Sequence, residues 1–251
     1  MRIGIVTGAS RGIGKTFAVK LANSHPDLDE IWCISRTGND EIFNNCGSVR
    51  IRYFQLDQSD ACFYSELKAM VVQSDVNVVY LIANAATAIA GTVLDQPFEE
   101  VDQMVQTNIR GTLAAVYAIA PLMQRGSRIV LVSSISADVP TPGLAVYTST
   151  KAFIRHWGLS LRNELRSRGV SVTIVLPGKV QTSALVDVVK RTGSWKLKLM
   201  LYQSVDYLVW RSLRAADRGQ AIVTPGVYSV VSWLFKLLPT RLVARMSSLA
   251  K

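Results

Sequence analysis

The sequence is poor in the residues that usually hold metal ions or form disulfide bonds. It has two histidines, His25 and His156, and three cysteines among 251 residues. Neither histidine belongs to a spaced cluster with Cys, Asp or Glu, so we expect no metal site. Cys33, Cys46 and Cys62 form no CxxC pair and cannot all be paired with one another. This usage favours a reducing compartment and predicts a cytoplasmic location.

Long apolar runs and linker segments are also missing. No run reaches the roughly 18 residues that a membrane-spanning helix needs, and the longest, residues 78–90, contains Asn84. A glycine-rich motif begins a few residues after Met1, so we expect no signal peptide. No repeat or linker rich in proline, glycine or serine divides the chain. With 49% hydrophobic and 18% charged residues, we expect one domain over residues 1–251 with a substantial core.

The charge is distributed very unevenly along the chain. Residues 1–150 hold 11 Lys and Arg against 14 Asp and Glu, whereas residues 151–251 hold 17 against 4. A basic surface favours anionic partners, such as a phosphorylated cofactor, an acyl thioester carrier, an acidic lipid surface or nucleic acid. The sequence has no recognised motif for reading nucleic acid, so we expect no nucleic-acid partner.

Apolar, β-branched segments alternate with longer helical patterns, which is typical of βαβ units and of a parallel sheet buried on both faces. We therefore expect an α/β fold with a doubly wound, seven-stranded parallel sheet and helices on both faces. The predicted strands are residues 2–7, 30–35, 49–56, 77–83, 128–133, 170–176 and 220–223. The predicted helices are residues 12–24, 59–74, 98–124 and 146–168, with further stretches within 183–217 and 227–248.

A glycine-rich segment, Thr-Gly-Ala-Ser-Arg-Gly-Ile-Gly, joins the first predicted strand to the first predicted helix at residues 7–14. Glycine permits positive φ and a close approach of the backbone to a ligand, and a helix N-terminus attracts anions. The segment fits a diphosphate-binding loop, although an ordinary tight turn would also use such glycines. The residues expected to contact a dinucleotide are Gly8, Ser10, Arg11, Gly12, Ile13 and Gly14.

The end of the second predicted strand carries no carboxylate. NAD-binding sites of this kind usually place an acidic residue here, which accepts hydrogen bonds from the ribose hydroxyls. Ser35 would not repel a 2′-phosphate, and Arg36 and Arg11 can bind one through charge-assisted hydrogen bonds. The sequence thus predicts NADP(H) over NAD(H). The alternative is that Arg36 is a solvated loop charge.

A serine, a tyrosine and a lysine further along the chain, Ser134, Tyr147 and Lys151, are spaced so that they could act together. Tyr147 and Lys151 are four positions apart in a predicted helix and so share one face. The lysine ammonium is expected to lower the pKa of the phenol from its usual value near 10. Ser134 can donate a hydrogen bond to an oxygen on which negative charge develops. Taken alone, the tyrosine and lysine could also be an ordinary pair on a helix surface.

Together these motifs, in this order and at these separations, resemble the classical short-chain dehydrogenase/reductase family from about residue 2 to residue 182. The resemblance implies a Rossmann-like sheet, a nicotinamide cofactor and hydride transfer to or from a carbonyl or alcohol carbon. The positions that carry it are the glycine loop, Asn84, Asn108, Ser134, Tyr147, Lys151, Pro177, Gly178 and Thr182.

The resemblance also implies a role for each matched residue. Tyr147 resembles the general acid, Lys151 the lysine that lowers its pKa and holds the nicotinamide ribose, and Ser134 the serine that orients the substrate. Asn108 resembles an asparagine that positions a water in a proton relay. Ala86 departs from the family, which commonly has glycine there. Other implied contacts are Asp57 at the adenine pocket, Asn84 at the central sheet, and Pro177, Gly178, Val180 and Thr182 near the nicotinamide.

Residues 183–251 are predicted to form a substrate lid and a basic amphipathic segment. Residues 190–201 interleave basic and apolar side chains, and residues 227–238 are rich in large apolar ones. Three interpretations stay open: a lid over a hydrophobic substrate, a surface that contacts lipid or an acyl carrier, and helices with core-facing apolar positions. Trp195 and Trp233 fit either packing or substrate contact.

We therefore expect an NADP(H)-dependent oxidoreductase that reduces a ketone or aldehyde, with a small, hydrophobic carbonyl substrate. A 3-oxoacyl-thioester reductase is the alternative substrate class, and a noncatalytic NADP-binding regulatory protein is the alternative of another class. The predicted helices at 98–124 and 146–168 resemble those through which family members associate, so a homodimer or homotetramer is expected. Peripheral contact with a membrane is compatible with the basic C-terminal part.

Overall fold

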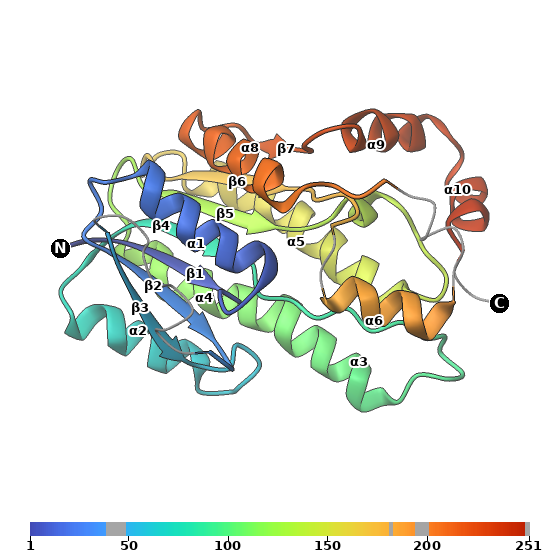
Figure 1. Ribbon diagram of the computed structural model, residues 1–251, viewed down its shortest axis with the longest axis horizontal. Coiled ribbons are helices and arrows are strands. Elements are labelled where there is room, and N and C mark those ends of the chain that lie inside the picture. Colours follow the sequence, from blue (N-terminus) through green and yellow to red (C-terminus); the bar gives the residue numbers. More distant parts are fainter. Residues whose placement is uncertain (39–48, 181–182, 194–200, 249–251) are drawn as a thin grey trace.

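Seven strands form one parallel sheet in the order β3-β2-β1-β4-β5-β6-β7 (Figure 1). The computed structural model describes residues 1–38, 49–180, 183–193 and 201–248. The sheet confirms the predicted doubly wound, Rossmann-like α/β fold, with strands close to the predicted ranges. They are β1 (Arg2–Thr7), β2 (Glu30–Ser35), β3 (Arg50–Gln55), β4 (Asn77–Ala83), β5 (Arg128–Val132), β6 (Ser171–Val175) and β7 (Ile222–Val223).

Helices cover both faces of the sheet (Figure 1). On one face, α1 and α8 pack over apolar side chains such as Val6 and Val130. On the other face, α2, α4 and α5 pack over Ile5 and Leu131. The bounds of the helices are α1 (Gly12–Ser24), α2 (Phe63–Gln73), α3 (Phe98–Val105), α4 (Gly111–Ile119), α5 (Ala145–Glu164), α6 (Ser183–Thr192), α8 (Val205–Asp217), α9 (Tyr228–Leu237) and α10 (Thr240–Ser247).

The strand order reverses between β1 and β4. Chains that leave the carboxyl ends of these two strands turn to opposite faces of the sheet, which opens a crevice where α/β proteins bind ligands. The central strands are almost wholly buried, because helices cover them on both sides. This burial explains why they read as continuous apolar runs in the sequence.

The predicted helix at residues 98–124 is interrupted, which is a correction to the sequence prediction. After α3 the chain makes a π-helical turn at Gln106–Arg110, continues as α4 and ends in a 3₁₀ turn at Ala120–Leu122. Gly111 packs so tightly on Gln58 that an added Cβ would lie 2.1 Å from the Gln58 Cγ atom. The π-helical turn thus lies directly before the residue that packs on Gln58, in the segment that follows β3. Within the described ranges, no helix is both long and apolar enough to cross a bilayer.

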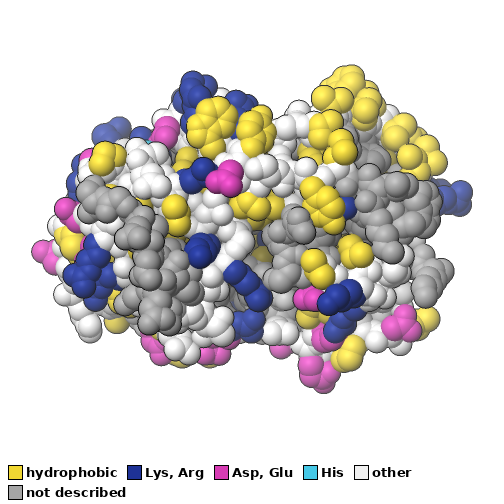
Figure 2. Space-filling view, viewed as in Figure 1, with side chains coloured by type: hydrophobic (Ala, Val, Ile, Leu, Met, Phe, Trp, Pro, Cys, Tyr) yellow, Lys and Arg dark blue, Asp and Glu magenta, His cyan; other side chains and the backbone are white. Residues whose placement is uncertain are grey.

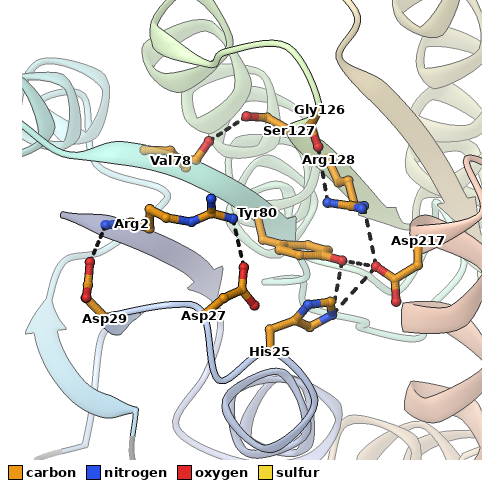
Figure 3. A network of polar contacts seen from close by, with 10 residues as sticks. All are labelled: Arg2, His25, Asp27, Asp29, Val78, Tyr80, Gly126, Ser127, Arg128 and Asp217. Atoms are coloured by element: carbon orange, nitrogen blue, oxygen red, sulfur yellow. Dashed lines mark hydrogen bonds and ion pairs between the residues drawn. The ribbon is translucent and has the colours of Figure 1, made fainter.

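On the side of the sheet opposite the crevice, a network of polar side chains links the ends of α1 and α8 to strands β4 and β5 (Figure 3). The buried Tyr80 hydroxyl donates to the carboxylate of Asp217 at the end of α8, and it lies 3.2 Å from Nε2 of His25. Nε of Arg128 lies 3.4 Å from the same carboxylate. Burial and the neighbouring Asp217 raise the pKa of Tyr80, so its hydroxyl stays protonated and donates.

Removing this hydroxyl should cost stability without changing the crevice. We expect Tyr80→Phe to lower the free energy of unfolding by about 1–2 kcal/mol, because the hydrogen bonds of the buried Tyr80 hydroxyl with Asp217 and His25 are lost. The midpoint of thermal unfolding should fall by about 2–4 °C for a chain of this size. Tyr64→Phe, at an exposed hydroxyl on α2, is the matched control and should change neither value. Equal stability of the two variants in urea titrations would contradict the role of the network.

Candidate active site

A cavity of about 720 Å³ opens at the carboxyl ends of β1, β4, β5 and β6. It brings together residues far apart in the sequence, and it includes nearly every residue that the sequence predicted for the site. Asn108 does not line it, and Thr182, like Trp195, lies outside the described residues. The predicted residues that do line it are Gly8, Ser10, Arg11, Gly12, Ile13, Gly14, Ser35, Arg36, Asp57, Asn84, Ser134, Tyr147, Lys151, Pro177, Gly178 and Val180.

The glycine loop forms one wall of the cavity and requires glycine for steric reasons. Gly8 and Gly12 have φ of +67° and +55°, which side chains disfavour. An added Cβ on Gly14 would lie 2.1 Å from the carbonyl oxygen of Gly8. No side chain caps the first turn of α1, and that turn contains no acidic residue. Its backbone N–H groups and the helix dipole therefore suit an anionic diphosphate group.

Asn84 fastens the end of β4 to the glycine loop. Its Nδ2 donates to the carbonyl oxygens of Thr7 and Gly8 at 3.1 and 3.3 Å. Its backbone N–H donates to Oγ1 of Thr7 at 3.1 Å, as does that of Ala85. Ala86, at the position where the family commonly has glycine, is exposed and does not have positive φ, so its methyl group causes no backbone strain.

Two arginines and a carboxylate lie near the end of β2: Arg36 follows β2, Arg11 belongs to the glycine loop, and Asp57 follows β3. Arg36 is exposed at the cavity rim, with Nε 3.7 Å from Oδ2 of Asp57, and Arg11 is exposed nearby on the glycine loop. The Ser35 hydroxyl donates to the carbonyl of Thr37 at 2.8 Å. The Tyr53 hydroxyl donates to the carbonyl of Ser35 at 2.6 Å, which fixes the turn from behind. This arrangement leaves both guanidinium groups at the edge of the cavity.

Ser134, Tyr147 and Lys151 converge at the other end of the cavity. Ser134 caps the 3₁₀ turn Ile135–Asp138, and its Oγ accepts hydrogen bonds from the N–H and the hydroxyl of Ser136 at 3.1 and 2.8 Å. Tyr147 lies in the first turn of α5. Lys151, one turn later, is buried and donates from Nζ to the carbonyl of Val132 at 3.1 Å. Nζ lies 5.8 Å from the centre of the Tyr147 ring.

The pKa of Tyr147 differs from the prediction. Burial raises it, and the hydrogen bond with Ser134 lowers it by a smaller amount. The net shift in the pKa of Tyr147 is thus upward rather than downward as expected, because desolvation of the buried phenol is its largest cause. Burial also lowers the pKa of Lys151 to about 8. The two side chains lie on one face as predicted, but their shared desolvation dominates.

Asn108 supports the site from behind. It is buried in the π-helical turn, where its Oδ1 accepts from the N–H of Thr87 at 2.8 Å. Its Nδ2 donates to the carbonyl of Thr87 at 2.9 Å and to Oγ1 of Thr150 at 3.0 Å. The side chain thus holds the segment after β4 against α5, and its polar atoms are engaged by protein groups.

Several supporting residues were missed by sequence reasoning. The ring of Tyr228 packs directly on Gly178, where an added Cβ would lie 1.9 Å from Cδ2 of the ring. Gln203 accepts from the N–H of Gly178 at 3.2 Å and donates to the carbonyl of Pro225 at 2.6 Å. No motif marks these residues, because their partners are remote in sequence. They fix the turn after β6 to the C-terminal part of the chain.

Comparison with known proteins agrees with this geometry. The short chain dehydrogenase family model matches residues 2–192. A very-long-chain 3-oxoacyl-CoA reductase from Ajellomyces capsulatus is 28% identical over 257 residues, covering 98% of this chain and 73% of that protein. A protein of the same name from Pyricularia oryzae is 35% identical over 182 residues, covering 68% of this chain and 54% of its own length. The chain thus spans only about half of this second relative.

Shorter proteins match over more of their length. The 3-oxoacyl-acyl-carrier-protein reductase FabG of Staphylococcus aureus is 29% identical over 227 residues, covering 87% of this chain and 92% of that protein. The structure of a short-chain dehydrogenase from Sphingobium yanoikuyae, in complex with NADPH, shares the fold with a TM-score of 0.78 at 24% identity. That likeness covers 93% of this chain and 91% of the other. The chain belongs to the short-chain dehydrogenase family of oxidoreductases.

Proposed function

We propose that the protein uses NADPH to reduce the 3-oxo group of an acyl thioester to a 3-hydroxy group. The observation that carries the proposal is the single cavity in which an anion-binding glycine loop and the Ser134, Tyr147 and Lys151 side chains face one space. The sequence placed a general ketone or aldehyde reductase first and a thioester reductase second. The relatives named as 3-oxoacyl reductases favour the second.

The residues of the cavity fit NADP(H). Backbone groups of the glycine loop would hold the diphosphate, Arg11 and Arg36 the 2′-phosphate, and Lys151 the nicotinamide ribose. The solved relatives from Sphingobium yanoikuyae and Burkholderia cenocepacia are in complex with NADPH and NADP. When bound, the cofactor supplies the hydride that the ketone carbon receives. The remaining task of the protein is to hold the ketone and to deliver one proton to its oxygen.

Tyr147 holds the proton that the product oxygen needs. Because burial raises its pKa, the phenol keeps that proton at neutral pH. Ser136 donates twice to Oγ of Ser134, so the one hydrogen of Ser134 points to another acceptor, which is the Tyr147 oxygen when no substrate is bound. In our proposal Ser134 orients the ketone oxygen by a hydrogen bond. The O–H bond of Tyr147 breaks as a new O–H bond forms on the product.

Lys151 stabilises the phenolate that remains after this transfer. Its Nζ lies 5.8 Å from the centre of the Tyr147 ring, and the lysine is buried. The carbonyl of Val132 holds Nζ in place, and the hydroxyl of Ser133 donates to the Lys151 carbonyl at 2.7 Å. Attraction between opposite charges is stronger in such a buried site than in water. The lysine is thereby proposed to act on the phenol rather than on the substrate.

The rate of reduction should fall as the pH rises through about 8. Burial lowers the pKa of Lys151 to about 8, so the ammonium is present below that value and lost above it. Deprotonation of Tyr147 would occur at higher pH, because the pKa of that group is raised. Profiles of kcat/KM between about pH 6 and pH 10 test this fall in rate. Lys151→Arg keeps the positive charge and should move the fall to higher pH. A fall at the same pH in Lys151→Arg would contradict its assignment to Lys151.

A substrate panel tests the proposed function. We would compare 3-oxoacyl thioesters of increasing chain length with methyl ketones of matched length, and follow the oxidation of NADPH. The thioesters should have kcat/KM at least about tenfold higher, since they offer further polar groups for recognition. Faster turnover of the matched ketones would favour a general carbonyl reductase. Tight binding of NADPH without any turnover would favour the noncatalytic alternative.

A further inference from the structure

Helix α9 turns its apolar side toward solvent. Val230, Trp233, Leu234 and Leu237 follow the spacing i, i+3, i+4, i+7 and are 56%, 59%, 50% and 63% exposed. Helices on soluble surfaces normally bury such a stripe. On the inward side of α9, Tyr228 and Ser232 are buried. Figure 2 shows hydrophobic side chains gathered over α9 and α10 along one edge of the molecule. Trp233 is thus not a core residue, because more than half of it is exposed.

Helix α10 extends the stripe and adds positive charge. Leu242 and Met246, four positions apart, are about half exposed. Arg241 and Arg245, also four positions apart, are exposed beside them. The sequence from residue 218 to residue 251 contains no aspartate or glutamate. An apolar stripe flanked by arginines, without acidic residues, complements a bilayer that contains anionic lipids.

The two helices that carry this surface also border the cavity. Ser232 of α9 and Met246 and Ser247 of α10 line the cavity itself. The Ser232 hydroxyl also donates to Asp138 at 3.2 Å, in the turn that Ser134 caps. A body that covered the apolar stripe would therefore lie next to the cavity.

We propose that α9 and α10 dock the protein peripherally on the surface of an anionic bilayer, with the cavity mouth facing the lipid. The stripe from Val230 to Leu237 is about 10 Å long, far less than the roughly 30 Å of a bilayer core, so it lies on the membrane rather than spanning it. Tryptophan suits the boundary between headgroups and acyl chains.

Flotation of the purified full chain with lipid vesicles tests the docking. At about 50 mM salt the protein should float with phosphatidylcholine vesicles that contain about 30 mol% phosphatidylglycerol, and it should largely stay behind with pure phosphatidylcholine. Trp233→Ser combined with Leu237→Ser should reduce the bound fraction at least about fivefold. Arg241→Gln combined with Arg245→Gln should weaken binding to the anionic vesicles by about tenfold.

Val72→Ser is the matched control, because Val72 is an exposed apolar residue on α2. It should float like the wild type, and every variant should keep its affinity for NADPH. Wild-type protein left in the soluble fraction with anionic vesicles would overturn the proposal, as would full binding by the Trp233 and Leu237 variant. Dissociation of an oligomer by that variant, without vesicles, would assign the surface to a second copy instead. The docking does not depend on the reaction, so failed turnover would leave this test intact.

Discussion

Tyr147→Phe should lower kcat for ketone reduction by about a thousandfold, within the range that loss of a positioned proton donor produces. Phenylalanine fills the space of the ring but has no proton to give. The hydroxyl hydrogen-bonds with Ser134, which lies outside α5, so we expect its removal to leave the backbone of α5 in place. The NADPH dissociation constant should therefore stay within about threefold of the wild-type value, which is under 1 kcal/mol.

Stopped-flow oxidation of NADPH, together with fluorescence titration of the cofactor, would separate the two effects. Tyr207→Phe is the matched control, since it removes an exposed hydroxyl on α8. It should change neither the rate nor the affinity. Turnover by Tyr147→Phe at more than about a tenth of the wild-type rate would show that another group supplies the proton.

The double variant Ser35→Asp, Arg36→Ala should reverse the preference from NADPH to NADH. The new carboxylate would repel a 2′-phosphate and accept hydrogen bonds from the ribose hydroxyls, and the lost guanidinium would remove a phosphate partner. Nε of Arg36 lies 3.7 Å from Oδ2 of Asp57. Removal of Arg36 therefore also takes this positive charge away from the Asp57 carboxylate, which would repel the 2′-phosphate more strongly. The ratio of kcat/KM values for the two cofactors should shift by at least about a hundredfold, or about 3 kcal/mol.

Arg50→Ala provides the control for a simple loss of charge. Arg50 begins β3, is exposed, and lies 3.9 Å from Glu30 rather than at the cavity. Its removal should leave the cofactor ratio unchanged. If the double variant kept the wild-type ratio, Arg36 would be a solvated loop charge, and the preference would have to arise elsewhere in the cavity.

Much of the fold was accessible from the sequence because its signals are local. Each buried strand is a short apolar run that ends near a turn, and the glycine loop has the spacing of a tight strand-to-helix turn. The separation of Tyr147 and Lys151 likewise places them on one helix face whatever surrounds them. These features can be recognised without knowing any tertiary contact, and the structure confirms the fold that they predict.

The remaining features depend on contacts between distant segments. Tyr228 packs on Gly178 from fifty residues away, and Asn108 bonds to Thr150 across the two helices. The direction of the Tyr147 pKa shift also depends on burial, which the spacing of two residues does not encode. The outward apolar face of α9 is a further case, because its pattern in the sequence equally fits a helix that faces the core.

The most direct test of the proposed reaction is to incubate the purified protein with NADPH and a 3-oxoacyl thioester and to identify the products. We expect the 3-hydroxyacyl thioester and NADP⁺ in equal amounts, with their formation lost in Tyr147→Phe. Tight NADPH binding without any hydroxyacyl product, across short and long acyl chains, would contradict the account.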